Sequence, residues 1–149
     1  MANTVVGDII AAAKARIAVV LSTYSALDYE YAVEENNFNN RPKRYGFIPK
    51  EVNFIDGRRL RHITGDQTFE LILSTDFTNH DDDSAKVVAA NELYSEIHEV
   101  IKDFATSRLG LTNDVQLIFP LAIAEPEFIE DNTICVLRAS IRISYIYTI

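Results

Sequence analysis

The sequence has little cysteine, little glycine and no long apolar run, and each shortage excludes a class of protein. One cysteine, Cys135, cannot form an intrachain disulfide or supply a cysteine-based metal cluster. No apolar run approaches the ~20 residues that span a bilayer, and the start of the chain lacks the pattern of a signal peptide. We therefore expect synthesis in a reducing cytoplasm and no membrane partner.

Basic residues are also scarce, since 14 Lys and Arg face 22 Asp and Glu and the formal net charge is −8. A general nucleic-acid binder is expected to be basic, so this class is disfavoured, although DNA could pass such a protein without adhering to it. The 5 glycines form no phosphate-binding loop, and no hydrolase or zinc-protease motif occurs. A chain of 149 residues is long enough for one domain with its own core.

Apolar periodicity predicts two helices. The first runs from Val5 to between Tyr24 and Leu27, and the second runs from Ser84 to Arg108 with Gly110 as a C-terminal stop. Three aspartates, residues 81–83, precede the second helix, where carboxylates favour the positive end of the helix dipole.

Alternating segments predict strands over residues 51–55, 68–77, 115–124 and 133–149. Pro120 interrupts the third of these, which predicts an edge strand or a bulge because proline cannot donate to a ladder. Residues 28–50 carry several asparagines and two prolines, which predicts an extended loop or arm.

The last predicted strand is longer than a compact domain of this size, and its apolar end must be covered. Its residues would extend roughly 55 Å, whereas a compact domain of this size is about 40 Å across. Its end, residues 143–149, has no charged side chain or proline and would aggregate if left open. We expect a central core strand, and pairing between copies through Tyr145 and Tyr147 is the alternative that can coexist with it.

Candidate reactive groups have plain structural explanations. His80 precedes the three aspartates, but consecutive carboxylates before a helix are better explained by capping than by a metal site. Glu125, Glu127, Glu130 and Asp131 could supply paired carboxylates, although a solvated acidic loop is the simpler interpretation. We therefore expect no catalytic residues, no metal and no cofactor.

Six cations gather in two short segments. Arg41, Lys43 and Arg44 lie in one, and Arg58, Arg59 and Arg61 follow a predicted Asp-Gly turn in the other. They are either solvated loops or electrostatic contacts to an acidic partner, which would set register and association rate.

The order of these elements resembles a known family. An amphipathic helix leads to Phe54-Ile55-Asp56-Gly57-Arg58, then to the alternating strand Phe69-Glu70-Leu71-Ile72-Leu73 and an Asp-rich helix start. The chain ends in Leu137-Arg138-Ala139-Ser140-Ile141-Arg142-Ile143-Ser144-Tyr145-Ile146-Tyr147. The sequence is similar to the tail terminator, or tail completion, proteins of long-tailed bacteriophages, of the lambda U type.

The resemblance implies an α+β fold, in which two helices pack on one face of a mixed, mainly antiparallel sheet. It implies a hexameric ring at the head–tail junction of a virion, which ends tail-tube polymerisation and joins the head connector. Its partners would be further copies, the tail tube protein and the connector or neck protein, and genomic DNA would pass through without specific binding. The open alternatives are a neck or head-completion ring protein and a small cytosolic enzyme.

Overall fold

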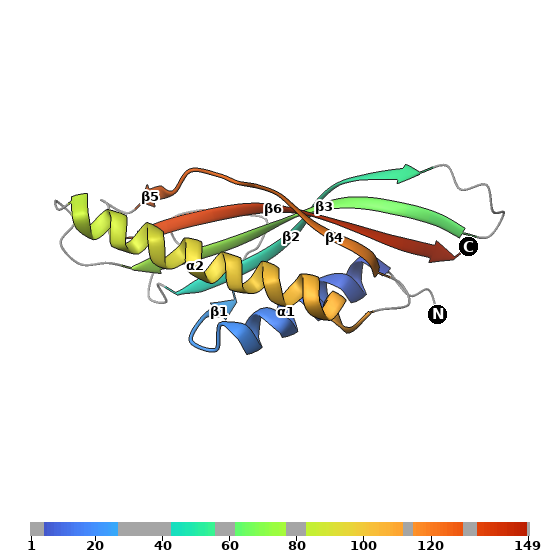
Figure 1. Ribbon diagram of the computed structural model, residues 1–149, viewed down its shortest axis with the longest axis horizontal. Helices are drawn as coiled ribbons and strands as arrows, with labels where there is room; N and C mark the ends of the chain where they lie inside the picture. Colours follow the sequence, from blue (N-terminus) through green and yellow to red (C-terminus); the bar gives the residue numbers. More distant parts are fainter. Residues whose placement is uncertain are drawn as a thin grey trace.

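The computed structural model describes residues 5–26, 43–55, 62–76, 83–111, 115–129 and 134–148. It is an α+β fold in which two helices cover one face of a six-stranded sheet (Figure 1). In chain order the elements are α1 (Val5–Val20), β1 (Ser25–Ala26), β2 (Arg44–Ile55), β3 (His62–Asp76), α2 (Asp83–Ser107), the 3-10 turn η2 (Arg108–Gly110), β4 (Val115–Ile123), β5 (Glu127–Ile129) and β6 (Ile134–Thr148).

The sheet has the strand order β1-β2-β3-β6-β4, and β5 pairs with the first part of β6. The β1–β2 pair is parallel and the other pairs are antiparallel. β6 lies against β3 over its whole length and against β4 and β5 on its other side. The prediction of a central final strand is therefore confirmed. On the side of β4 and β5 the pairing ends at Tyr145, and residues 146–148 pair with β3 alone in the described part of the chain.

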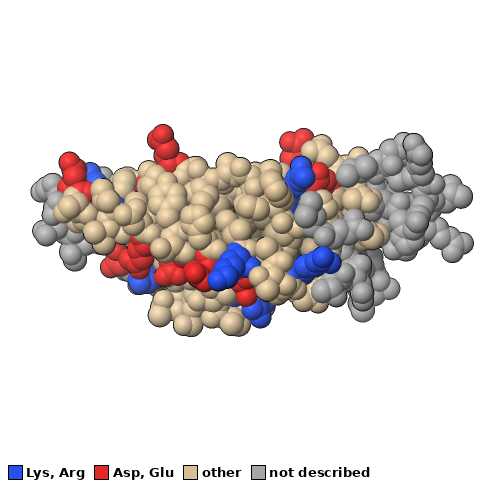
Figure 2. Space-filling view, in the orientation of Figure 1, with Lys and Arg blue, Asp and Glu red and all other residues tan. Residues whose placement is uncertain are grey.

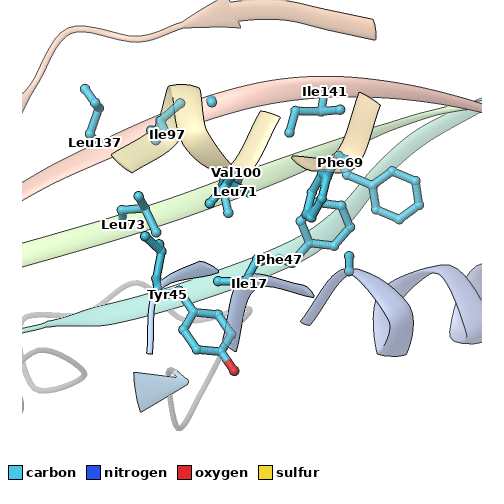
Figure 3. Packing of buried hydrophobic residues seen from close by; sticks show 14 of the residues in the cluster. Ile17, Tyr45, Phe47, Phe69, Leu71, Leu73, Ile97, Val100, Leu137 and Ile141 are labelled. Atoms are coloured by element: carbon cyan, nitrogen blue, oxygen red, sulfur yellow. The ribbon is translucent and has the colours of Figure 1, made fainter. Parts of the chain in front are cut away.

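The main core lies between the helices and the facing side of the sheet. Buried side chains of α1 and α2 form one cluster with the odd-numbered residues of β3 and β6 (Figure 3). Phe47 of β2 stacks on Phe69 of β3 with ring centroids 4.9 Å apart, and Phe104 of α2 forms a T-shaped contact with Phe47, with centroids 5.8 Å apart. This aromatic contact joins α2 to two neighbouring strands.

The helix boundaries follow the local sequence closely. α1 ends at Val20, before the predicted end, because Ser22 and Thr23 favour turns over helix. α2 ends at Ser107, and Arg108, Leu109 and Gly110 then all have positive φ angles. The predicted stop at Gly110 is confirmed as part of this left-handed turn.

The predicted arm over residues 28–50 extends too far toward the C-terminus. Residues 44–50 belong to β2, because Tyr45 and Phe47 alternate toward the buried face of the sheet. Pro49 is tolerated there because β2 has a register shift between Pro49 and Val52. Residues 28–42 of the predicted arm lie outside the described residues.

β4 is an edge strand, as Pro120 predicted. Its register against β6 shifts between Pro120 and Ala122, which is the expected bulge. Two large apolar side chains of this edge, Phe119 and Leu121, are about half exposed.

The sheet is longer than the helix layer. The last part of β2, the first part of β3 and the end of β6 extend beyond both helices (Figure 1). Here the ring of Tyr145 lies over Gly65, the residue opposite it on β3, in space that a side chain would need. The Tyr145 hydroxyl donates a hydrogen bond to Gln67 Oε1 at 3.2 Å.

Candidate assembly surfaces

The first predicted basic segment divides between surface and interior. Lys43 is partly exposed, and its ammonium lies 3.2 Å from Glu92 of α2. Arg44 is only 2% exposed, and its Nη1 donates to the backbone oxygen of Ala26 at 2.6 Å. The assignment of Arg44 to a docking surface is therefore corrected, because its guanidinium holds β1 against β2 inside the subunit.

Four of the six predicted basic contact residues, Arg41, Arg58, Arg59 and Arg61, lie outside the described residues. The last three belong to segment 56–61, which connects β2 to β3.

The predicted tyrosine contacts are corrected in part. Tyr145 is 3% exposed and belongs to the core cluster, because its ring packs over Gly65. It is therefore an internal residue and offers no surface to a second copy. Tyr147 lies opposite Ile63 in the sheet register, and its side chain is outside the described part of the structure.

The predicted acidic loop is described only in its first half. Glu125 is exposed between β4 and β5, and the half-exposed Glu127 accepts a hydrogen bond from Arg138 Nε at 3.1 Å. Arg138 also donates to Glu70 at 2.9 Å across the sheet. Glu130 and Asp131 lie outside the described residues.

The sheet face opposite the helices combines a second, smaller apolar cluster with charged side chains that pair with one another. The members of this cluster are Ile48, Ile72, Ile134 and Val136, and all are buried. Arg138 bridges Glu70 and Glu127, and Arg142 lies 3.2 Å from Asp66 and over the ring of Phe119. Arg138 and Arg142 therefore both have carboxylate partners on neighbouring strands, which weakens either of them as a contact for a phosphate.

A row of carboxylates lies along α2 on the side that meets α1 and the start of β2. We call it the acidic stripe; its members follow helical spacing and are Glu92, Glu96, Glu99 and Asp103. Figure 2 shows acidic and basic side chains gathered between the two helices, below a wide surface with few charges.

The two ends of the acidic stripe hold intramolecular cations. Arg16 Nε of α1 donates to Asp103 Oδ2 at 2.9 Å, and Arg16 Nη2 contacts the other carboxylate oxygen. Lys43 pairs with Glu92 at the opposite end. Within the described ranges, Glu96 and Glu99 form no ion pair, and Lys43 acts on Glu96 only from a distance.

Burial and the nearby Glu92 carboxylate raise the pKa of Glu96, while Lys43 acts in the opposite direction. Tyr24 packs beneath this region with the Lys43 ammonium 5.8 Å from its ring centroid. Burial, then Glu96 and Glu92, raise the pKa of Tyr24. Its hydroxyl is buried without a hydrogen-bond partner in the described part of the chain.

The stripe was not among the sequence predictions. Its signal was present as four acidic residues at alternating spacings of four and three, but the same spacing also suits a solvated helix face. The exposed apolar residues were missed for a different reason, since each belongs to an otherwise ordinary amphipathic pattern. They are Val19, Phe54, Val87, Val88, Phe119 and Leu121.

The thiol of Cys135 faces the core on β6. Burial raises its pKa to about 11, which keeps the sulfur protonated near neutral pH. Among the described residues, no cluster of histidine, cysteine and carboxylate side chains is arranged to hold a metal ion. No described helix has the length and hydropathy needed to cross a membrane.

Comparisons with known proteins give a likeness of fold. No protein-family model matches the sequence, and no curated protein matches it. Among solved structures, the chain is similar to one chain of the virion of a native gene transfer agent particle. The TM-score is 0.56 at 15% identity, and the match covers 98% of this chain and 100% of that chain.

Proposed function

We propose that this chain is a structural protein of a tailed virion, which caps the tail tube as a ring and joins it to the head connector. The observation that supports this most strongly is the end-to-end fold likeness to a chain of a gene transfer agent virion. The order of elements that resembles tail terminators supports the same proposal. In this role the chain binds copies of itself, the tail tube protein and the connector, and it transforms no substrate.

The charge distribution is compatible with a ring through which DNA moves. A net charge of −8 per copy repels phosphate, so the genome would slide past without being held. The pairing of Arg138 and Arg142 with carboxylates weakens both of them as contacts for phosphate. The predicted acidic loop would lie near the lumen or on a ring face; its residues are Glu125, Glu127, Glu130 and Asp131.

Removal of the protein from the virion that encodes it tests this role. Particles made without the chain are expected to show tails of irregular, extended length that carry no heads, and the supplied wild-type chain should restore both defects. Tails of normal length that still lack heads would favour the neck or head-completion alternative. Normal particles in the absence of the chain would contradict both roles.

The Arg58→Glu, Arg59→Glu double variant tests the second basic segment as a contact. We expect a folded monomer with an unchanged circular dichroism spectrum and weaker assembly, because the reversed charges oppose an acidic partner. Unchanged tail length and unchanged particle yield would refute this assignment.

A further inference from the structure

Glu96, in the middle of the acidic stripe, is a partly buried carboxylate with no cation in contact. The end members Glu92 and Asp103 are paired within the subunit, whereas Glu96 and Glu99 form no ion pair in the described ranges. Burial and the Glu92 carboxylate raise the pKa of Glu96 by more than the distant Lys43 lowers it. A carboxylate that is partly desolvated beside another carboxylate gains from a close cation.

A second polar group without a partner lies beneath this part of the stripe. Tyr24 is only 6% exposed, and its hydroxyl forms no hydrogen bond in the described part of the chain. Glu96 and Glu92 are the carboxylates whose charges raise the pKa of this hydroxyl, so it lies close to both of them. Buried hydroxyls are normally hydrogen-bonded, so Tyr24 and Glu96 together lack a donor at one place.

A guanidinium group can supply what both residues lack. Its N–H donors form a planar fork, which can donate to a carboxylate along one edge and to a phenol oxygen along another. An ammonium has no such fork, and Lys43 shows the result, because its ammonium lies 3.2 Å from Glu92 and leaves the Tyr24 hydroxyl unbonded.

Other ligand classes fit this place less well. The carboxylates repel the phosphates of a nucleic acid. Among the described residues, no group of histidine, cysteine and carboxylate side chains is arranged to hold a metal ion. A cationic side chain of a protein remains, and Val19 of α1, which is 67% exposed one turn after Arg16, offers apolar surface to the stem of such a side chain.

The described part of this chain offers few guanidinium groups for the role, which points to a different protein as the source. Four of its five described arginines already have partners within the subunit, namely Arg16, Arg44, Arg138 and Arg142.

We propose that the middle of the acidic stripe binds an arginine side chain of another virion protein, with Glu96 and Glu99 as its ion-pair partners and the Tyr24 hydroxyl oxygen as a further acceptor. Lys43 and Arg16 keep their places at the two ends of the stripe. The contact rests on the virion role proposed above and adds the chemistry by which one partner is recognised.

Short peptides added to the purified full-length chain test this chemistry. Capped tetra-arginine should bind and shift backbone NMR signals of Tyr24 and of residues 92–103, and capped tetra-lysine should bind at least about threefold more weakly. Glu96→Gln with Glu99→Gln should weaken tetra-arginine binding about tenfold, which corresponds to about 1.4 kcal/mol. High salt should weaken the binding because the ion pairs are partly exposed.

Two further variants separate a specific site from general attraction. Glu51→Gln with Asp76→Asn removes the same charge at exposed positions on β2 and β3 and should leave binding unchanged. Tyr24→Phe should reduce the preference for tetra-arginine and leave tetra-lysine binding as it is, which a purely electrostatic patch would not show. Circular dichroism confirms that each variant is folded.

A cross-link in assembled particles tests the source of the arginine. Ser95, an exposed neighbour of Glu96, is replaced by the photoreactive residue p-benzoylphenylalanine, and the cross-linked peptides are identified by mass spectrometry. An arginine-containing peptide of a different virion protein is expected. A cross-link to a second copy alone, or to no other protein, would overturn the inference.

Equal binding of the two peptides to the wild type, or equal binding of tetra-arginine to the stripe variant and the control variant, would also overturn it. Neither result bears on whether particles without the chain have tails of irregular length, which tests the proposed function separately.

Discussion

At the scale of single residues, Gly65 is fixed by the ring that covers it. A Cβ at this position would collide with the ring atoms of Tyr145, which is itself buried. Gly65→Ala should destabilise the fold by about 1–3 kcal/mol, the usual cost of overpacking, as measured by urea unfolding. In a Tyr145→Ala background the same substitution should cost much less, because the obstructing ring is gone. Equal costs in both backgrounds would contradict this packing.

Arg44 and Lys43 are neighbours in the sequence with different roles. Arg44→Met removes a buried guanidinium that bonds the Ala26 carbonyl, and we expect a loss of about 1–3 kcal/mol in the free energy of unfolding. Lys43→Met removes a partly exposed ion pair and should cost less than about 1 kcal/mol. Chemical denaturation of both variants measures the difference, and a larger loss for Lys43→Met would contradict the assignment.

The buried Cys135 thiol makes the free energy of unfolding depend on pH in the alkaline range. Burial raises its pKa in the folded chain from 9.0 to about 11, so between these values the unfolded chain releases a proton that the folded chain keeps. The free energy of unfolding should therefore fall as pH rises above 9.0. Denaturation of Cys135→Ala, compared with the wild type from pH 7 to 10, should show a shallower fall, and identical profiles would contradict the burial of the thiol.

Single residues also show which features of the fold could be predicted from the sequence and which could not. The helix-facing side of β6 was predictable, because apolar and polar residues alternate from Leu137 to Tyr145. The burial of Ile134 and Val136 on the other face was not, because the alternation is interrupted there. The burial of Arg44 was not, since a cation beside Lys43 has the pattern of a surface cluster and only the Ala26 carbonyl, which is remote in sequence, gives it a partner. The position of Tyr145 over Gly65 likewise depends on the register between two strands.

At the scale of elements, α2 is attached to the sheet through Phe104. Its ring contacts Phe47 of β2, which stacks on Phe69 of β3, so the three rings join α2 to two strands. Phe104→Ala should lower the free energy of unfolding by about 3–5 kcal/mol because it leaves a buried cavity. Val88→Ala on the exposed side of α2 should change it by less than about 0.5 kcal/mol. Comparable losses in urea unfolding would contradict this packing.

The elements themselves were largely predictable, because both helices and the long strands have strong apolar periodicity. β1 and β5 were missed, since their few residues carry too little pattern to be recognised. The start of β2 was assigned to a loop because Pro42 and Pro49 are typical of turns, while an edge strand tolerates a proline at a bulge. The order of strands in the sheet could not be predicted from periodicity. Periodicity indicates which face of a strand is buried, but it does not indicate which strands pair with each other.

At the scale of the whole molecule, the sheet presents two unlike edges and an end that extends past the helices (Figure 1). Exposed apolar residues lie on these outer parts, Phe54 at the end of β2 and Phe119 with Leu121 on β4. Unlike surfaces on one subunit suit head-to-tail contacts, which close into a ring when the rotation allows it. For the candidate site, the sequence predicted an acidic protein with two local basic segments. The acidic stripe could be recognised only once the contacts of α2 with α1 and the start of β2 were known.

Cryo-electron microscopy of tails from particles that contain this chain tests the central claim most directly. The account predicts a closed ring of density at the head-proximal end of the tube, into which copies of this fold dock side by side. Tail ends without such a ring, or this chain found elsewhere as an isolated subunit, would contradict it.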